Sequence, residues 1–410
     1  MNSIGTINYK KPKMKFVDLR AQYDEIKSEI DASIKEVIDS TAFIHGPQVE
    51  RFEKNLSSFI GSKHVISCAN GTDALQIALM SLGLKPGDEV IVPAFTYVAT
   101  AEVVALLGLV PVMVDVDRQT FNISVIGLER ALTERTRAIV PVHLYGQCAD
   151  MESLLEFAHY NGLYLVEDNA QAIGAKYTFS SAAAAKRLCP GASGESNTLF
   201  SGRMGDIGCT SFFPSKNLGC FGDGGALFTE SDELAERIRM IANHGQNIKY
   251  HHRLIGCNSR LDTLQAAILD VKLKYLPQYI QARYKAACYY TAGLDTVLRE
   301  LGIEEDLISL PFEAPYSTHV YHQYTLRVKS SIREELKEFL AEGGVPSMIY
   351  YPLPLQKQEA FKNIARAVGS LNVSQELSDS VLSLPMHTEL STGQMDMVIE
   401  RVRDFLRNEI

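Results

Sequence analysis

Short apolar runs alternate with amphipathic segments over the first two thirds of the chain. The runs have the length of strands, whereas Asp73–Leu82, Thr100–Leu107 and Met151–Tyr160 carry apolar residues at helical spacing. This alternation predicts an α/β fold with a mostly parallel, seven-stranded sheet covered by helices. The expected strands are Val65–Cys68, Glu89–Pro93, Val110–Val114, Ala138–Leu144, Leu163–Val166, Cys209–Phe213 and Ala226–Phe228.

The pattern changes in the last third of the chain. A long helix is expected from about Thr263, and shorter strands and helices follow at Val320–Val328, Arg333–Gly343 and Met395–Asn408. A chain of 410 residues also exceeds the usual size of one hydrophobic core. We therefore expect a large domain of residues 14–275 and a smaller C-terminal α/β domain of residues 276–410.

One stretch inside the alternating part lacks a clear pattern. Residues Thr178–Arg203 contain a run of serine and alanine followed by glycine, serine, asparagine and proline, with few large apolar side chains. Such a composition predicts an exposed loop. The loop is either a passive surface excursion or a lid over a site.

Charge and composition exclude several classes of protein. A net charge of −9 and the lack of a long basic run argue against a nucleic-acid partner. No 18 uncharged apolar residues run together, so no membrane span is expected, and Met1–Lys15 lacks the apolar stretch of a secretory signal. The seven cysteines are scattered, and His251-His252 lacks the spacing of a zinc site. We expect a cytoplasmic protein with reduced thiols and no metal.

A candidate anion site lies where a helix follows the first strand. Gly71 permits a tight turn, and the amide groups of the first helical turn, over Gly71, Thr72 and Asp73, are free to point outward. The Thr72 hydroxyl adds a further hydrogen-bonding group. An ordinary capped helix is the alternative explanation of the same residues.

A candidate cofactor ligand ends the strand Leu163–Val166, which runs into Glu167 and Asp168. Asp168 is placed at the carboxyl edge of the sheet, where open α/β folds bind ligands. A carboxylate there can keep a pyridinium nitrogen protonated, and Gln171 can bond a ring substituent. A helix-capping acid is the alternative role for Asp168.

The strongest candidate for covalent chemistry is Lys216, on a turn after a strand that contains Ser211. A lysine held beside apolar rings is desolvated, so its pKa falls and its amine becomes nucleophilic toward a carbonyl. A solvated surface lysine is the alternative. The chain order is that of pyridoxal 5'-phosphate (PLP) enzymes of the aspartate aminotransferase fold, type I. In that likeness Ser211 and Thr72 hold the phosphate, Asp168 meets the ring nitrogen and Lys216 forms the Schiff base.

Two further motifs flank these candidates. Tyr97 follows another strand end, where its ring either stacks on the cofactor or packs in the core. Gly222–Gly225 leads into a strand, which indicates a tight turn. A nicotinamide-dependent oxidoreductase needs a glycine-rich turn between an early strand and a helix, and the sequence has none.

Together these motifs resemble the DegT–StrS family of nucleotide-sugar aminotransferases over nearly the whole chain. The resemblance implies PLP as cofactor, L-glutamate as amino donor, a nucleotide-linked keto sugar as acceptor, and a homodimer with shared active sites. By the same likeness Asn258 reaches the cofactor phosphate of the neighbouring subunit. Arg260 is a candidate for binding a substrate phosphate or carboxylate, with a structural ion pair as its alternative. The most specific blocks are Asn70–Leu75, Pro93–Thr100, Glu167–Gln171, Ser211–Lys216 and Gly256–Ala267.

The likeness is greatest to enzymes that aminate the 3-keto group of a UDP-linked N-acetylated glucuronic acid, which implies a role in O-antigen and lipopolysaccharide biosynthesis. Where such enzymes typically show His-Tyr-Pro, this chain has Tyr350-Tyr351-Pro352, and both tyrosines are candidate substrate residues. Tyr350 can donate a hydrogen bond but cannot carry a positive charge. A dTDP-linked 3-keto-6-deoxyhexose or a 4-keto sugar therefore stays open. A related dehydratase has histidine in place of Lys216, and a non-catalytic sensor would tolerate its loss.

Overall fold

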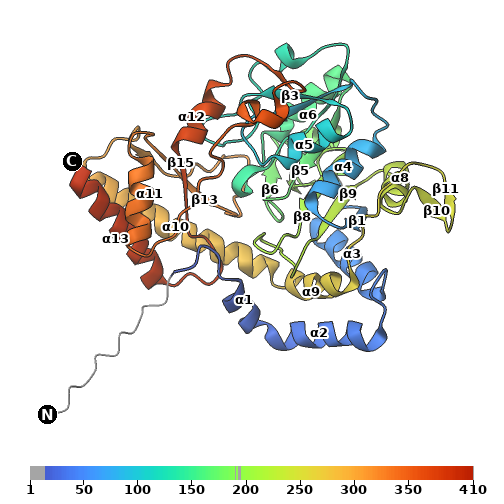
Figure 1. Ribbon diagram of the computed structural model, residues 1–410, viewed down its shortest axis with the longest axis horizontal. Helices are drawn as coiled ribbons and strands as arrows, with labels where there is room; N and C mark the ends of the chain where they lie inside the picture. Colours follow the sequence, from blue (N-terminus) through green and yellow to red (C-terminus); the bar gives the residue numbers. More distant parts are fainter. Residues whose placement is uncertain (1–13, 190, 193–194, 410) are drawn as a thin grey trace.

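A computed structural model describes residues 14–189, 191–192 and 195–409 (Figure 1). The start of the chain, where no secretory signal is expected, lies outside the described residues up to position 13. Among the described residues, no helix combines the length and apolar character needed to cross a membrane.

An eight-stranded sheet forms the centre of the larger part of the molecule, in the order β1-β9-β8-β5-β4-β2-β3-β14. β9 runs antiparallel to both of its neighbours, whereas the other neighbouring pairs are parallel. The strands are β1 His64–Cys68, β2 Glu89–Pro93, β3 Val110–Val114, β4 Thr136–Ile139, β5 Tyr164–Asp168, β8 Ile207–Ser211, β9 Gly225–Thr229 and β14 Arg366–Ala367. The mostly parallel sheet is confirmed, with one strand more than the seven expected.

Helices cover both faces of this sheet (Figure 1). Those of the larger part are α1 Leu19–Glu25, α2 Lys27–Ser40, α3 Pro47–Ile60, α4 Gly71–Ser81, α5 Ala99–Leu106, α6 Met151–Asn161, α7 Ala182–Leu188, α8 Asp232–Ala242 and α9 Thr263–Leu273. Short 3-10 helices lie at Leu128–Ala131, Leu144–Gly146, Leu355–Lys357 and Glu359–Phe361. Two small hairpins pair β6 Lys176–Thr178 with β7 Thr198–Phe200, and β10 Gln246–Ile248 with β11 His251–His252.

The last third of the chain builds a second layer of helices on a small sheet. The long helix expected from Thr263 is divided, because α9 ends at Leu273 and α10 begins at Leu276. A separate apolar core joins α10 to the elements around it. The elements are α10 Leu276–Leu301, β12 Ile308–Ser309, β13 Tyr324–Val328, α11 Arg333–Glu342, α12 Asn372–Ser380, β15 Val381–Leu384 and α13 Thr392–Glu409, with the sheet order β12-β13-β15.

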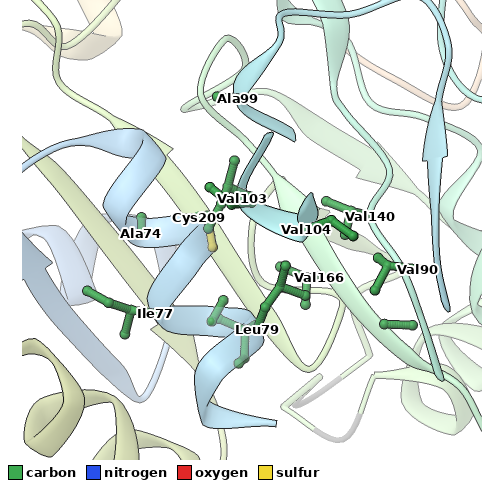
Figure 2. Close-up of a cluster of buried hydrophobic side chains, with 14 of the residues drawn as sticks. Ala74, Ile77, Leu79, Val90, Ala99, Val103, Val104, Val140, Val166 and Cys209 are labelled. Atoms are coloured by element: carbon green, nitrogen blue, oxygen red, sulfur yellow. The ribbon is translucent and has the colours of Figure 1, made fainter. Parts of the chain in front are cut away.

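A core of small and branched side chains fixes α4 and α5 on one face of the main sheet. Figure 2 shows Ile77 of α4 and Val103 of α5 lying over Val166 and Cys209 of the sheet. These side chains are almost fully buried. Because parallel strands covered by helices have buried faces, their sequences read as continuous apolar runs, which is why they could be expected from sequence.

A chain crossing that the sequence does not indicate joins the last third to the main sheet. The strand β14 pairs in parallel with β3, and Arg366 bonds the buried carboxylate of Glu89 at 3.0 Å. Leu355, Phe361 and Leu371 pack into the same core as α4 and α5. The division into residues 14–275 and 276–410 therefore stays a proposal. Residues 355–371 come after the proposed boundary but pack against the larger part.

The stretch Thr178–Arg203 contains more structure than the expected exposed loop. β6 and β7 form a hairpin, and its connection contains α7, which begins after Ser181, whose side chain accepts from the Ala184 amide at 3.0 Å. Ala185 and Leu188 are buried against the second face of the sheet. The loop expectation was wrong for 182–188, because alanine has the highest helix propensity and a serine cap was present. Residues 190, 193 and 194 lie outside the described part.

Candidate active site

The carboxyl ends of β1, β2, β4, β5 and β8 meet at one edge of the main sheet, and a cavity of about 450 Å³ opens there. Its walls bring together residues that are far apart in the sequence. Those predicted from the sequence are Gly71, Thr72, Tyr97, Asp168, Gln171, Ser211, Lys216, Tyr350 and Tyr351. A larger groove of about 720 Å³, which includes Arg118 and Arg327, contains none of the predicted residues.

The helix start at α4 forms one end of the cavity. Asn70 caps the helix, with its side-chain oxygen accepting from the Asp73 amide at 2.8 Å. A Cβ atom at Gly71 would lie 2.6 Å from the Cβ of Ser211, so only glycine lets the helix approach β8 this closely. Thr72 and Ser211 then present two hydroxyls beside the positive end of the helix. Asp73 is not part of the cavity wall. It contributes its backbone amide, which donates to the capping side chain of Asn70.

Asp168 lies at the end of β5, where the residue is 6% exposed. The Thr100 hydroxyl donates to one carboxylate oxygen at 2.8 Å, and the Ala170 amide donates to the other at 3.2 Å. Burial raises the pKa of Asp168, whereas these two hydrogen bonds and the nearby Lys216 act in the opposite direction. Thr100 is a part of the site to which the sequence reasoning gave no role.

The neighbouring acid, Glu167, has a different role. Its carboxylate is fully buried and lies 2.8 Å from His143 Nε2. It also accepts hydrogen bonds from the backbone amides of Gly202, Met204 and Gly205, at 2.8, 2.6 and 2.7 Å. Every one of these contacts is internal to the protein, and Glu167 is not part of the cavity wall. Of the two consecutive acids, Glu167 fastens the loop before β8 and Asp168 faces the cavity.

Lys216 lies on the turn after β8 with its side chain in the cavity wall. Burial lowers the pKa of its amine to about 8, and the carboxylate of Asp168 acts in the opposite direction. The expected desolvation of this lysine is therefore present. About a tenth of the amine is therefore unprotonated at pH 7 and about half at pH 8, and this is the form that attacks a carbonyl.

A tyrosine network forms the wall on the other side. The Gln171 side chain accepts from the Tyr145 amide at 2.8 Å and donates to the Tyr351 hydroxyl at 3.0 Å. The Tyr145 hydroxyl donates to the carbonyl of Tyr350. The ring of Tyr97 lies 6.0 Å from that of Tyr351 and is 55% exposed, so core packing does not describe Tyr97.

Two predicted residues lie elsewhere on the chain. Asn258 is exposed, and Arg260 lies in a groove with Glu50, Glu53 and Arg239, outside the cavity. Among the described residues, Arg260 makes no ion pair, so the alternative of a structural ion pair finds no support in this chain.

The residues of the cavity fit PLP. The α4 helix start with Thr72 and Ser211 suits its phosphate, Asp168 suits its ring nitrogen and the Lys216 amine suits its aldehyde. His322 and Gln323 also line the cavity, although sequence reasoning did not find them. They come from the segment before β13, and no local pattern marks that segment as part of a site.

Comparisons with known proteins show which family this chain is similar to. The model of the DegT/DnrJ/EryC1/StrS aminotransferase family matches residues 24–403. A Pseudomonas aeruginosa protein, UDP-2-acetamido-2-deoxy-3-oxo-D-glucuronate aminotransferase, is 46% identical over 94% of this chain and 98% of its own length. The dTDP-3-amino-3,4,6-trideoxy-alpha-D-glucose transaminase of Streptomyces venezuelae is 40% identical over 96% of both chains.

A solved structure agrees in fold. The crystal structure of S. venezuelae DesV in complex with a ketimine intermediate superposes with a TM-score of 0.86 and 39% identity, covering 97% of this chain and 99% of that one. The chain therefore belongs to the DegT/DnrJ/EryC1/StrS aminotransferase family, whose members depend on PLP.

Proposed function

We propose that this chain transfers an amino group from L-glutamate to the 3-keto group of UDP-linked 2-acetamido-2-deoxy-3-oxo-glucuronic acid, in the biosynthesis of a bacterial surface polysaccharide such as O-antigen. The observation that carries the proposal is Lys216, whose amine has a pKa of about 8 in the same cavity as Asp168. The choice of sugar rests on the 46% identity to the P. aeruginosa enzyme that carries this substrate in its name.

The described side chains divide the work of amino transfer. When bound, PLP supplies an aldehyde that takes up the amino group and a ring that withdraws electrons from the substrate carbon. Lys216 has a pKa close to the working pH, so its amine can both accept and return a proton at that carbon. Asp168, which is fixed by Thr100 and Ala170, would hold a proton on the ring nitrogen of bound PLP. Amino donor and keto sugar then react in turn at one site, which predicts ping-pong kinetics.

We also propose that the active unit is a homodimer in the cytoplasm. Asn258 and Arg260 would complete the neighbour's site, Asn258 at the cofactor phosphate and Arg260 at a phosphate or carboxylate of the substrate. The cytoplasmic location is supported by the seven cysteines, all of which are free thiols.

A second candidate substrate is a dTDP-linked 3-keto-6-deoxy sugar, and a 4-keto sugar is a further variant of it. Tyr350 favours this candidate, because a phenol cannot balance the charge of a sugar carboxylate, and burial raises its pKa further. The S. venezuelae relative carries a dTDP-linked deoxy sugar in its name. A sugar dehydratase and a non-catalytic sensor have less support, because both Lys216 and Asp168 are present in a formed cavity.

The test is a substrate panel. Purified protein loaded with PLP is incubated with L-glutamate and, in separate reactions, with UDP- and dTDP-linked 3-keto and 4-keto sugars, and the amino sugar is measured by mass spectrometry. We expect the highest kcat/KM with the UDP-linked 3-oxo-glucuronate. A Tyr350→His variant should raise the preference for that carboxylated sugar over neutral ones. Turnover of a simple keto acid with no keto sugar accepted would overturn the substrate class.

A further inference from the structure

Several polar side chains in the cavity wall have protein partners. Asp168 accepts hydrogen bonds from Thr100 and Ala170. The Gln171 side chain is hydrogen-bonded to Tyr145 and Tyr351. Three buried polar atoms of wall residues have no hydrogen-bond partner among the described residues, namely Thr96 Oγ1, His322 Nδ1 and Gln323 Oε1, and the last two belong to adjacent residues. His322 is 7% exposed and Gln323 is 8% exposed. A polar atom left unpaired in a protein interior is unfavourable, so adjacent residues of this kind in a cavity wall are candidates to bond a ligand there.

The segment that carries both residues is held firmly in place. The Asn217 side chain, next to Lys216, donates to the Val320 carbonyl at 2.9 Å. The backbone amide of Gln323 donates to the Tyr145 carbonyl at 3.3 Å. Arg283 Nη1 donates to the carbonyls of Tyr321, His322 and Met386 at 3.0, 3.4 and 3.1 Å. These contacts fix residues 320–323 to the turn of Lys216 and to the tyrosine wall. The backbone that carries the two side chains is therefore fixed before a ligand enters.

Residues 320–323, which form the wall segment, are also packed too closely against Gly146 to move aside. Gly146 has φ +117°, and a Cβ atom there would lie 2.9 Å from the backbone nitrogens of both Tyr321 and His322. Only glycine permits this approach. A rigid wall of this kind selects a ligand by the position of its hydrogen-bonding groups.

The chemistry of the two side chains restricts the ligand. Burial, with the nearby charges of Lys216 and Arg283, lowers the pKa of His322 well below its ordinary value, so the imidazole is neutral at physiological pH. A neutral imidazole and a primary amide each offer both a donor and an acceptor. They suit uncharged hydroxyl and amide groups, whereas a carboxylate or phosphate is better matched by a cation.

We propose that His322 and Gln323 bind the uncharged hydroxyl and acetamido groups of the sugar ring and thereby determine which sugar is accepted. This inference rests on the proposed function, since it places the sugar in the cavity that contains Lys216. The nucleotide and the phosphates are left to other parts of the site.

Calorimetric binding to the PLP-loaded protein tests the assignment, with each nucleotide sugar compared with its bare nucleotide. The probes are UDP-N-acetylglucosamine against UDP, and dTDP-glucose against dTDP. Gln323→Met and His322→Leu should each weaken binding of a nucleotide sugar about tenfold, as expected for one lost hydrogen bond to a rigid wall, while leaving the bare nucleotide within about twofold. His322→Gln retains a terminal amide and should recover most of the loss.

Gln375→Met on α12 is the matched control, because Gln375 also has a buried unpaired oxygen but lies outside this cavity. Its affinities should equal those of the wild type. Equal weakening of nucleotide sugar and bare nucleotide in the His322 and Gln323 variants would indicate a merely structural role and overturn the assignment, as would unchanged affinities. If the wild type binds the nucleotide sugars through these residues but aminates no keto sugar, the inference stands and the proposed function fails.

Discussion

Lys216 and Asp168 are coupled, and each changes the protonation of the other. Burial destabilises the charged form of both groups, which lowers the pKa of Lys216 to about 8 and raises that of Asp168. Their opposite charges partly offset this effect. The result is an amine that is available for reaction near neutral pH beside an acid that is anchored by two hydrogen bonds.

This coupling predicts a shift in the pH dependence of cofactor uptake. Only the neutral amine reacts with PLP, so the uptake rate of the apoprotein should rise with pH through a midpoint near 8. Removing the charge of Asp168 removes the group that favours the ammonium form, so Asp168→Asn should move the midpoint to lower pH. Stopped-flow absorbance on wild type and variant measures both midpoints under the same conditions.

Asp206→Asn serves as the control, because Asp206 bonds the Leu165 amide outside the cavity and its pKa is also raised by burial. Its midpoint should equal that of the wild type. A midpoint in Asp168→Asn that stays in place or moves to higher pH contradicts the coupling of the two groups.

At the level of elements, the sequence predicted what local pattern determines. The buried strands and the helices α4, α5 and α6 appear as apolar runs and helical periodicities, and each occurs within a few residues of its expected bounds. Ala138–Leu144 was expected as one strand, but β4 ends at Ile139. Beyond Ile139 the chain stays beside the sheet through isolated hydrogen bonds, such as that from the Val140 amide to the Ile91 carbonyl at 2.8 Å.

Elements that depend on distant partners could not be predicted. β14 has two residues and no periodicity, and Arg366 is bonded there to Glu89, 277 positions earlier in the chain. The wall residues His322 and Gln323 are part of the cavity only because Arg283 and Gly146 hold their segment. The site motifs were accessible because each follows a strand end, and parallel strands bring their carboxyl ends to one edge.

The close packing at Gly146 predicts a large effect of one methyl group. Gly146→Ala should lower the free energy of unfolding by about 3 kcal/mol, because strain at positive φ adds to a clash with two backbone nitrogens. Gly127 also has positive φ, +82°, but no atom lies within 4 Å of its Cβ position, so Gly127→Ala should cost only about 1 kcal/mol. Urea unfolding of both variants measures the difference. Equal costs would show that the wall segment yields without penalty.

For the whole molecule, the distribution of site residues decides whether one chain is sufficient. The cavity contains Lys216 and Asp168, whereas Arg260 lies in a separate groove of the same chain. If subunits share their sites, Lys216→Ala and Arg260→Ala should each be inactive alone but complement each other when refolded together. A mixed dimer then has one intact site, so random mixing restores about a quarter of the wild-type kcat per site.

Activity assays on the mixed and unmixed proteins, with size-exclusion chromatography to verify dimers, measure this recovery. Two copies of the same variant provide the control, because refolding them together creates no intact site. Full activity of Arg260→Ala by itself would remove Arg260 from the site, and the lack of recovery in mixed dimers would indicate that each chain works alone.

The position at which PLP becomes attached tests the proposed role of Lys216 most directly. The protein is loaded with PLP, reduced with borohydride, digested and mapped by mass spectrometry, with Lys216→Arg and Lys272→Arg treated in parallel. Lys272 is a stringent control, since burial also lowers its pKa to about 8, but its amine bonds the Gly219 carbonyl at 2.6 Å outside the cavity wall. We expect a pyridoxyl group on Lys216 in the wild type and in Lys272→Arg, and none in Lys216→Arg. A group on any other lysine, or a wild-type protein that takes up no PLP, would contradict this role.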